Sequence, residues 1–228
     1  MASPSTSETA AFAPRPLKRS ELLRFDVYMY DSPKIGRRVS VLRPAALAMA
    51  LEHEFSPETE TFVERPRYLK AGSTSYELSF WTRSVRGFEQ FQLLTGFPAG
   101  TTGELRSAQR KKDEVIQAGK DAQIALLLKP EAAYLQLARA NANRMRLLPY
   151  VQTARELSDI NTVKSRVVEL FAYQERLSFH RIEQAIKNID ARNVRAATCA
   201  LIHSGDLRID LSAKLHVHSN VEKQAVQS

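Results

Sequence analysis

In the first part of the chain, the spacing of apolar residues changes from that of a helix to that of strands. Residues 42–55 place apolar positions on most of a helix surface, and Pro44 suits the first turn of that helix. Three extended segments follow, at residues 61–69, 75–83 and 87–94, with Gly87 at the turn before the last. The pattern predicts a buried helix followed by a hairpin.

The next stretch alternates again between the two spacings. The charged residues 103–119 predict a helix, residues 123–128 predict a short apolar strand, and residues 130–148 predict a second helix. Helices and strands thus interleave through the first 150 residues. The natural solution for such a sequence is an α/β layer.

In residues 161–221 the spacing of apolar residues changes and predicts short helices that follow each other closely. Ser178 is suited to cap a helix that contains Ile182, and Asp190 is suited to cap the next helix, at residues 191–203. Gly205 stands where a helix stop is expected. Residues 207–210 and 214–218 are short enough to be paired strands, so three helices and a hairpin predict a winged helix-turn-helix.

Composition then sets the boundaries of the domains. Residues 1–19 are rich in Ser, Thr, Ala and Pro without apolar periodicity, which predicts a flexible basic arm carrying Arg15, Lys18 and Arg19. We expect an α/β domain at residues 20–150 and the winged domain at residues 151–228. With 43% hydrophobic residues, the chain of 228 residues has enough apolar material for a core.

Charge and cysteine content narrow the classes of partner and compartment. The formal net charge is +8 and the isoelectric point is near 9.7, which favours a polyanion such as nucleic acid. Cys199 is the single cysteine, so neither an intramolecular disulfide nor a multi-cysteine zinc site can form. No apolar run approaches the roughly 20 residues of a membrane span, and we expect a cytoplasmic protein.

Candidate DNA contacts lie on the third helix and the wing of the C-terminal domain. In a winged domain the third helix enters the major groove, where Arg can bridge two acceptors of guanine and Asn those of adenine. The residues expected to point away from the predicted core face of Val194 and Leu201 are Arg192, Asn193, Arg195 and Thr198, while Arg208 and Lys214 are expected near the wing. The alternative is a protein-binding winged domain with a solvated basic face.

The sequence also contains one His-x-His pair, His216 and His218, whose rings a strand would place on one side. No third ligand has a matching spacing. We therefore interpret both residues as wing residues that face solvent or phosphate.

Three stretches resemble the TnsA endonuclease subunit of heteromeric bacterial transposases. The first carries "SPK", "GRRVS" and an apolar helix that leads into "EFSPETETFVERPRYL"; the second is "SGDLRIDLSAKLHVHSNV" near the end of the chain. Between them, "ARANANRMRLLPY" is similar to a helix that follows the nuclease core of that family. Together the three stretches cover most of the chain.

The resemblance implies a restriction-endonuclease-like domain before the winged domain. The family cuts with a Glu on the first helix, an Asp on a hairpin strand and a Lys on the next strand; the carboxylates hold Mg²⁺ and the lysine orients water. Alignment on "EFSPET" places Ala46, Ser79 and Gln92 at these three positions. We therefore expect a degenerate nuclease domain at residues 20–150, with Glu77 as the best candidate for a replacement acid.

The expected function is a non-catalytic DNA-binding subunit that positions DNA ends in transposition. The charge and the winged domain favour double-stranded DNA as a partner, and the resemblance implies a transposase and an AAA+ ATPase; a second copy of the chain is a further candidate partner. No cofactor is expected. One alternative is an active endonuclease with a migrated pocket near Glu52, Glu54, Glu77 or Glu89, which would need Mg²⁺ or Mn²⁺. The other is a sequence-specific regulator of a mobile element.

Overall fold

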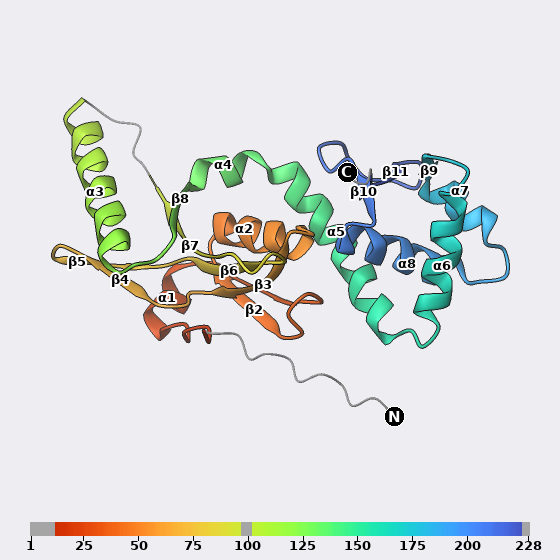
Figure 1. Cartoon of the computed structure of the whole chain (residues 1–228), viewed down its shortest axis with the longest axis horizontal. Coiled ribbons are helices and arrows are strands. Elements are labelled where there is room, and N and C mark those ends of the chain that lie inside the picture. The colour runs from red at the N-terminus through yellow and green to blue at the C-terminus, as the bar shows by residue number, and fades with distance from the viewer. Residues whose placement is uncertain (1–11, 97–101, 225–228) are drawn as a thin grey trace. The chain divides into compact units, whose positions relative to one another are not determined.

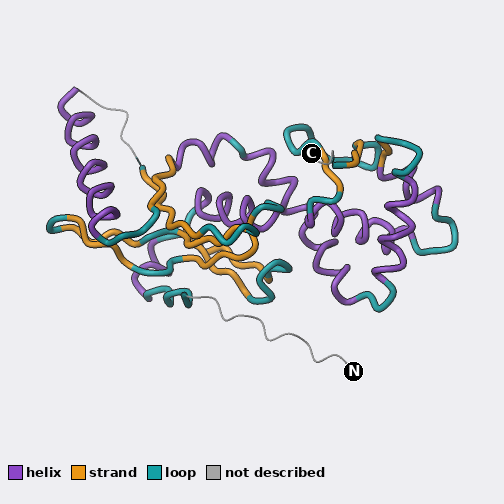
Figure 2. The backbone as a smooth tube through the Cα atoms, in the orientation of Figure 1, coloured by secondary structure: helices purple, strands orange, loops and turns teal. Residues whose placement is uncertain are grey.

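The computed structural model describes residues 12–96 and 102–224 and shows a mixed α/β protein (Figures 1 and 2). The chain divides into two compact units. The first unit draws on Met1–Phe25 and Glu60–Pro130, and the second on Asp26–Thr59 and Glu131–Ser228. The second unit is therefore built from two separate parts of the sequence.

The first unit contains a mixed four-stranded sheet, a hairpin and two helices. The sheet has the order β3-β6-β7-β8, and β4 pairs with β5 in the hairpin. The elements are α1 (Arg19–Arg24), β3 (Thr59–Glu64), β4 (Tyr68–Ala71), β5 (Thr74–Glu77), β6 (Phe80–Ser84), β7 (Glu89–Thr95), α3 (Thr102–Asp121) and β8 (Leu126–Pro130).

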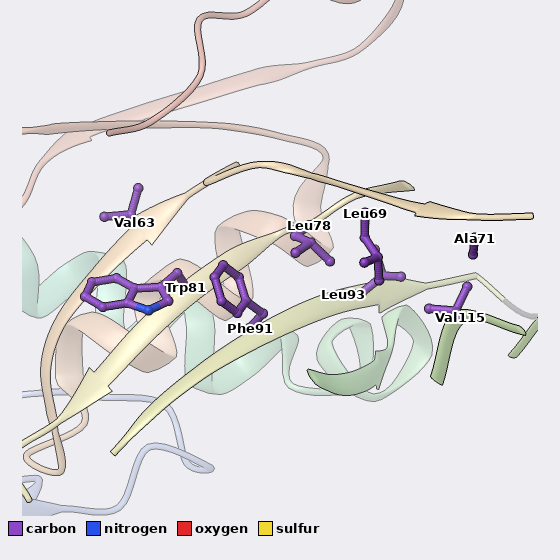
Figure 3. Close-up of a cluster of buried hydrophobic side chains, with 8 residues drawn as sticks. All are labelled: Val63, Leu69, Ala71, Leu78, Trp81, Phe91, Leu93 and Val115. Carbon is purple, nitrogen blue, oxygen red and sulfur yellow. The ribbon is translucent and has the colours of Figure 1, made fainter. Parts of the chain in front are cut away.

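The directions of the strands in the four-stranded sheet follow from the connections between them. Strands β6 and β7 are antiparallel and joined by a short turn at Gly87, which has a φ of 78°. Strand β8 runs parallel to β7, and α3 supplies the crossover that a parallel pair requires. A buried apolar cluster forms the core of this unit (Figure 3): Val63, Leu69, Ala71, Leu78, Trp81, Phe91, Leu93 and Val115.

Residues 12–18, which we call the strap, pack against the first unit. Phe12 places its ring 5.4 Å from Trp81 and 5.2 Å from Phe91 in edge contacts. The Arg15 N–H donates to the Arg65 carbonyl at 3.2 Å. Residues 12–19 thus do not form the free arm that composition predicts, because one aromatic ring and one arginine find partners on the sheet. Residues 1–11 of the expected arm lie outside the described residues.

The second unit contains two small sheets and most of the helices. Strand β1 pairs with β2, and a three-stranded antiparallel sheet has the order β10-β11-β9. The elements are β1 (Val27–Asp31), β2 (Arg38–Leu42), α2 (Pro44–Phe55), α4 (Glu131–Gln136), α5 (Ala138–Glu156), α6 (Ile160–Leu170), β9 (Arg176–Ser178), α7 (Phe179–Ala185), α8 (Ala191–Ser204), β10 (Leu207–Ile209) and β11 (Asn220–Lys223).

The predicted ends of the C-terminal helices are confirmed. The Ser178 hydroxyl accepts the Arg181 N–H at the start of α7, and the Asp190 carboxylate accepts the Arg192 N–H at the start of α8. Gly205 ends α8 in the left-handed region, with a φ of 87°. Capping chemistry is local, which explains why the sequence predicts these positions.

Several expected elements differ from the observed ones. The strand expected at residues 214–218 is wrong, because these residues form a loop and the second strand is β11. The extended segment at residues 61–69 is split between β3 and β4 by a bend at Arg65, whose φ is 48°. The boundary expected at residue 150 falls inside α5, a continuous helix.

Among the described residues, none of the helices combines the length and the apolar character that a membrane crossing demands.

Candidate nucleic-acid interface

Helix α8 is buried by its neighbours in the second unit. Thr198 has no exposed surface, and its hydroxyl donates to the Val194 carbonyl at 2.8 Å. Ala154 of α5 packs against Ala196 and Ala200 of α8. The expectation that Thr198 projects outward is therefore wrong: Thr198 stands one turn after Val194, on the same buried face of α8.

The remaining candidates on α8 lie near its N-terminal end. Arg195 Nη2 is 2.6 Å from Glu183 Oε1, and this hydrogen bond is the main reason why the pKa of Arg195 is raised. The Arg195 side chain is thus held in an internal pair and does not point freely away from the unit. Arg192 is exposed and Asn193 is partly exposed. A direct role of these two residues in base contacts stays a prediction.

The two wing candidates, Arg208 and Lys214, line one surface cavity. The cavity has a volume of about 570 Å³ and lies between the three-stranded sheet and the loop of residues 210–219, which we call the wing loop. The side chains with polar or charged groups on its lining are Arg176, Arg208, Asp210, Lys214, His216, His218, Ser219, Asn220 and Glu222. The structure therefore separates the wing candidates from those on α8.

Two arginines hold Glu222 between them in this cavity. Glu222 on β11 lies opposite Arg208 on β10 and opposite Arg176 on β9. Arg208 Nη2 is 2.8 Å from Glu222 Oε2, and Arg176 pairs with Oε1. One carboxylate is thus shared by two guanidinium groups. The three side chains together keep one net positive charge, and the guanidinium groups keep N–H donors that the carboxylate does not use.

The second acid of the cavity, Asp210, is occupied by the wing loop itself. Its carboxylate accepts the Ser212 N–H at 2.8 Å and the Ser212 hydroxyl at 2.6 Å. The Ser212 hydroxyl is the main cause of the lowered pKa of Asp210. Lys214 has no ion-pair partner in the described part of the chain and is exposed. The cavity therefore presents an unneutralised ammonium group to solvent.

Three imidazoles gather beside this cavity. The rings of His180 and His218 are 5.5 Å apart, and those of His216 and His218 are 6.1 Å apart. His216 Nδ1 accepts the His218 N–H at 3.0 Å, so the neutral His216 ring carries its proton on Nε2. Both residues of the His-x-His pair are exposed wing residues that can donate to an oxyanion.

Asn143 of α5 fixes the wing loop, and sequence reasoning missed it. The Asn143 side chain is fully buried, and its Nδ2 donates to the carbonyls of Leu211 at 2.8 Å and Ala213 at 2.6 Å. Its Oδ1 accepts the Leu215 N–H at 3.4 Å. A polar residue four positions before the buried Leu147 on the same helix face was the available signal.

Ser79 and Gln92 lie next to each other in the first unit. The Ser79 N–H donates to the Gln92 carbonyl at 2.8 Å, and the Ser79 hydroxyl accepts the Leu94 N–H at 2.9 Å. Gln92 is 2% exposed on β7. The two positions at which the resemblance implies an acid and a lysine therefore support the pairing of neighbouring strands. Ala46 lies on α2 in the second unit.

Glu77, the candidate replacement acid, is engaged by the strap. Arg15 Nη1 lies 3.2 Å from Glu77 Oε1, and the Arg15 guanidinium lies 3.7 Å from the centre of the Tyr68 ring. Burial, followed by the charge of Glu21, raises the pKa of Glu77. A carboxylate that is paired with arginine is less available to a metal ion.

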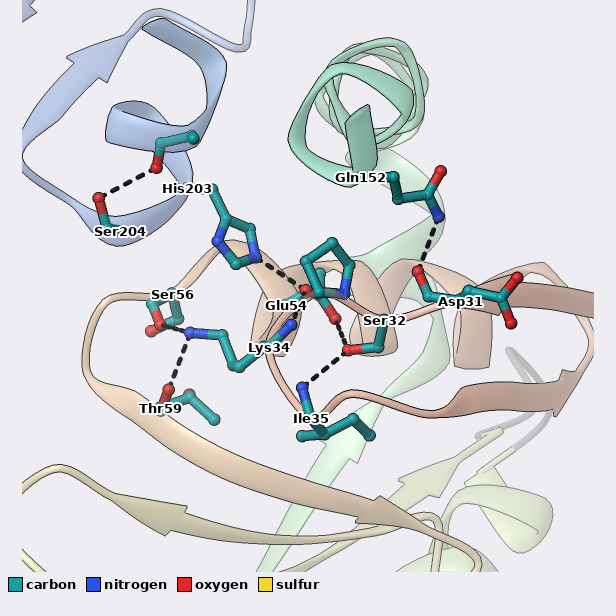
Figure 4. A network of polar contacts seen from close by, with 12 residues as sticks. Asp31, Ser32, Lys34, Ile35, Glu54, Ser56, Thr59, Gln152, His203 and Ser204 are labelled. Carbon is teal, nitrogen blue, oxygen red and sulfur yellow. Dashed lines mark hydrogen bonds and ion pairs between the residues drawn. The ribbon is translucent and has the colours of Figure 1, made fainter. Parts of the chain in front are cut away.

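Two of the other acids named for a migrated pocket, Glu54 and Glu89, are also in local use. Glu89 Oε2 accepts the indole N–H of Trp81 at 3.2 Å. Glu54 has no exposed surface and accepts from the Lys34 N–H at 2.9 Å, from the Ser32 hydroxyl and from His203 Nε2 at 2.7 Å (Figure 4). This network joins α2 to the loop after β1 and to the end of α8.

The ammonium group of Lys34 also belongs to the network around Glu54. Its Nζ donates to the carbonyls of Ser56 and Thr59, each at 2.9 Å (Figure 4). Burial lowers the pKa of Lys34, and the charge of Glu54 opposes this effect. The network is saturated with internal partners, so we assign it to structure.

No known family model matches the chain, and no curated protein is significantly similar to it.

Proposed function

We propose that the protein is a non-catalytic DNA-binding subunit similar to TnsA, which holds DNA phosphates at the wing cavity. The observation that carries this proposal is the cavity itself, where Lys214 stands unpaired beside the arginine pair on Glu222. Contacts to phosphate fix the position of a protein on a duplex without reading its sequence. Such contacts suit a subunit that positions DNA ends.

The order of elements supports a winged helix-turn-helix in the second unit. Helices α6, α7 and α8 are followed by β10 and β11, and β9 between α6 and α7 completes the antiparallel sheet. Because α5 covers α8, the contact surface of this domain moves from the third helix to the wing. In this proposal the basic wing binds the backbone, and Arg192 and Asn193 are peripheral.

The arrangement around Ser79 supports a degenerate restriction-endonuclease-like domain. Along the chain, the apolar helix α2 precedes the hairpin of β6 and β7, as the resemblance implies. The Ser79 and Gln92 side chains have no group that could ionise to bind Mg²⁺ or activate water. The scaffold would then hold DNA or a partner without cutting.

The same resemblance suggests a transposase or an AAA+ ATPase as protein partner in the cytoplasm. A suitable contact in the first unit is the tip of the β6–β7 hairpin, where Val85 and Phe88 are each 61% exposed. Exposed apolar groups of this size are common in protein interfaces.

Binding of a fluorescent DNA duplex across a salt series tests the proposal. Wild type is compared with Lys214→Gln, and Arg166→Gln on the exposed side of α6 serves as the matched control. Loss of one phosphate contact should reduce the slope of log K against log salt by about 0.9. The control should keep the wild-type slope.

Mn²⁺ is present in the same experiment, and the DNA is inspected afterwards. Intact DNA is expected for a non-catalytic subunit. Cutting that Glu77→Ala abolishes would instead establish the endonuclease alternative. DNA binding that is unchanged in Lys214→Gln would exclude the wing cavity as the DNA site. A preference of about a thousandfold for one DNA sequence would favour the alternative of a sequence-specific regulator.

A further inference from the structure

Arg65 is a buried cation of the first unit that lacks part of its hydrogen bonding. It is 8% exposed, and its Nε and Nη1 are buried without a hydrogen-bond partner. These two nitrogens carry three of the roughly five N–H donors of a guanidinium group. An unsatisfied buried donor is costly, so such a group is expected to have a ligand in at least one state of the protein.

Neighbouring cations extend the site around Arg65. The Nε of Arg67 is also buried without a partner, and its guanidinium lies 5.1 Å from the centre of the Phe91 ring. Arg15 and Lys18 both face the ring of Tyr68, at 3.7 and 5.6 Å. Burial is the main cause of the lowered pKa of Arg65, and of these cations Arg15 lies close enough to Arg65 to help lower it.

The acids near this site are already engaged. Glu77 pairs with Arg15, and Glu21 accepts the Lys18 N–H at 2.8 Å. Glu64 is 2% exposed and has contacts of its own. The three acids attract Arg65 electrostatically, but they accept no hydrogen bond from its Nε and Nη1 or from Arg67 Nε, so these donors remain for an anion with several acceptor oxygens.

The strap covers this face. Phe12 contacts Trp81 and Phe91, and the backbone of Arg15 is bonded to that of Arg65. We propose that Arg65 and Arg67 form an oxyanion site for a phosphate group, free or in a nucleic-acid backbone, which the strap closes. The strap occupies the position from which the ligand enters. This site goes beyond the proposed wing contact and lies in the other unit.

Calorimetry with inorganic phosphate and the full chain tests the site. Phe12→Ala weakens the strap by removing two aromatic contacts and should tighten phosphate binding by about tenfold. Adding Arg65→Met should abolish that binding, whereas adding Arg86→Gln at the exposed hairpin tip should leave it unchanged. Thermal unfolding checks that each variant remains folded.

Duplex DNA in the Lys214→Gln background distinguishes the two sources of phosphate. Arg65-dependent binding of DNA but not of inorganic phosphate would identify a nucleic-acid backbone, and the reverse result would identify a free phosphate. Binding of both ligands that survives Arg65→Met would overturn the site. DNA binding that depends on Lys214, together with no Arg65-dependent binding of either DNA or inorganic phosphate, would overturn this inference alone and leave the wing proposal intact.

Discussion

Asn143 Nδ2 donates to the Ala213 carbonyl at 2.6 Å and thereby ties α5 to the wing loop. The residues are 70 positions apart in the sequence. The same amide group also bonds Leu211 and Leu215, so one buried side chain sets the path of the wing loop. The geometry of the proposed phosphate contact therefore depends on a helix that does not line the cavity.

Replacing this anchor should weaken folding and DNA binding together. Asn143→Leu leaves the carbonyls of Leu211 and Ala213 unsatisfied, at a cost of about 1–3 kcal/mol in the free energy of unfolding. Urea unfolding measures this loss, and the salt series measures binding. Arg146→Leu, on an exposed position of the same helix, is the control. Equal stability of the two variants would contradict the anchoring role.

Removal of Arg195 should affect stability more than DNA binding. Glu183 is 11% exposed and would lose its cationic partner, so we expect Arg195→Ala to cost about 1–3 kcal/mol. Arg192→Ala removes an exposed side chain and should change stability by less than about 0.5 kcal/mol. A large loss of DNA affinity in stably folded Arg195→Ala would instead restore α8 as the contact helix.

The stability of the protein should be sensitive to the loss of the Glu54 carboxylate. Glu54→Ala leaves Ser32, the Lys34 N–H and His203 without their buried partner, with an expected cost of about 3–5 kcal/mol. Glu58→Ala, an exposed position just beyond α2, should be close to neutral. Thermal unfolding followed by circular dichroism compares the two, and similar Tm values would show that the network is dispensable.

Glu77 predicts a pH dependence of stability. Its pKa is raised in the folded chain, mainly by burial, so the folded state holds the proton more tightly than the unfolded state. This contribution is complete below the unfolded pKa and is lost as pH rises through the folded pKa. Glu77→Gln cannot ionise and should gain stability relative to wild type as the pH rises above about 4, the ordinary pKa of a glutamate.

Chemical denaturation at several pH values measures that difference. Glu114→Gln, an exposed carboxylate of α3 in the same unit, should show no such trend. A stability advantage of wild type that grows with pH would mean that the pair with Arg15 outweighs the cost of burying Glu77.

Two glycines with positive φ form a matched pair of substitutions. A Cβ at Gly205 would lie 2.5 Å from Pro57 Cβ, whereas a Cβ at Gly87 would meet nothing within 4 Å. Gly87→Ala should cost about 1 kcal/mol from backbone strain alone. Gly205→Ala should cost at least about 2 kcal/mol, because the clash adds to the strain. Equal losses in urea unfolding would contradict the close approach to Pro57.

Local signals explain which parts of the fold the sequence predicts. The caps at Ser178 and Asp190 and the stop at Gly205 depend on neighbouring residues, and all three are confirmed. The strand expected at residues 214–218 fails because its alternation resembles a strand while Asn143, far away in sequence, holds those residues as a loop.

Part of the candidate site could also be predicted from local signals in the sequence. Arg208 and Lys214 do line one cavity, since a short hairpin keeps its residues together. Thr198 was misplaced because it lies one turn after Val194 on the buried face of α8, where its hydroxyl is satisfied by the Val194 carbonyl. Arg65 carried no local signal, because its neighbours Arg15 and Glu21 are distant from it in the sequence.

The pairing of Glu54 with His203 spans 149 positions of the chain. At roughly 5–20 residues per second, the ribosome adds that stretch in on the order of ten seconds. During this time α2 has left the ribosome, while the imidazole that bonds its last acidic residue has not been made. A nascent chain must therefore keep this carboxylate hydrated, and the second unit can close only after nearly all of the protein has been translated.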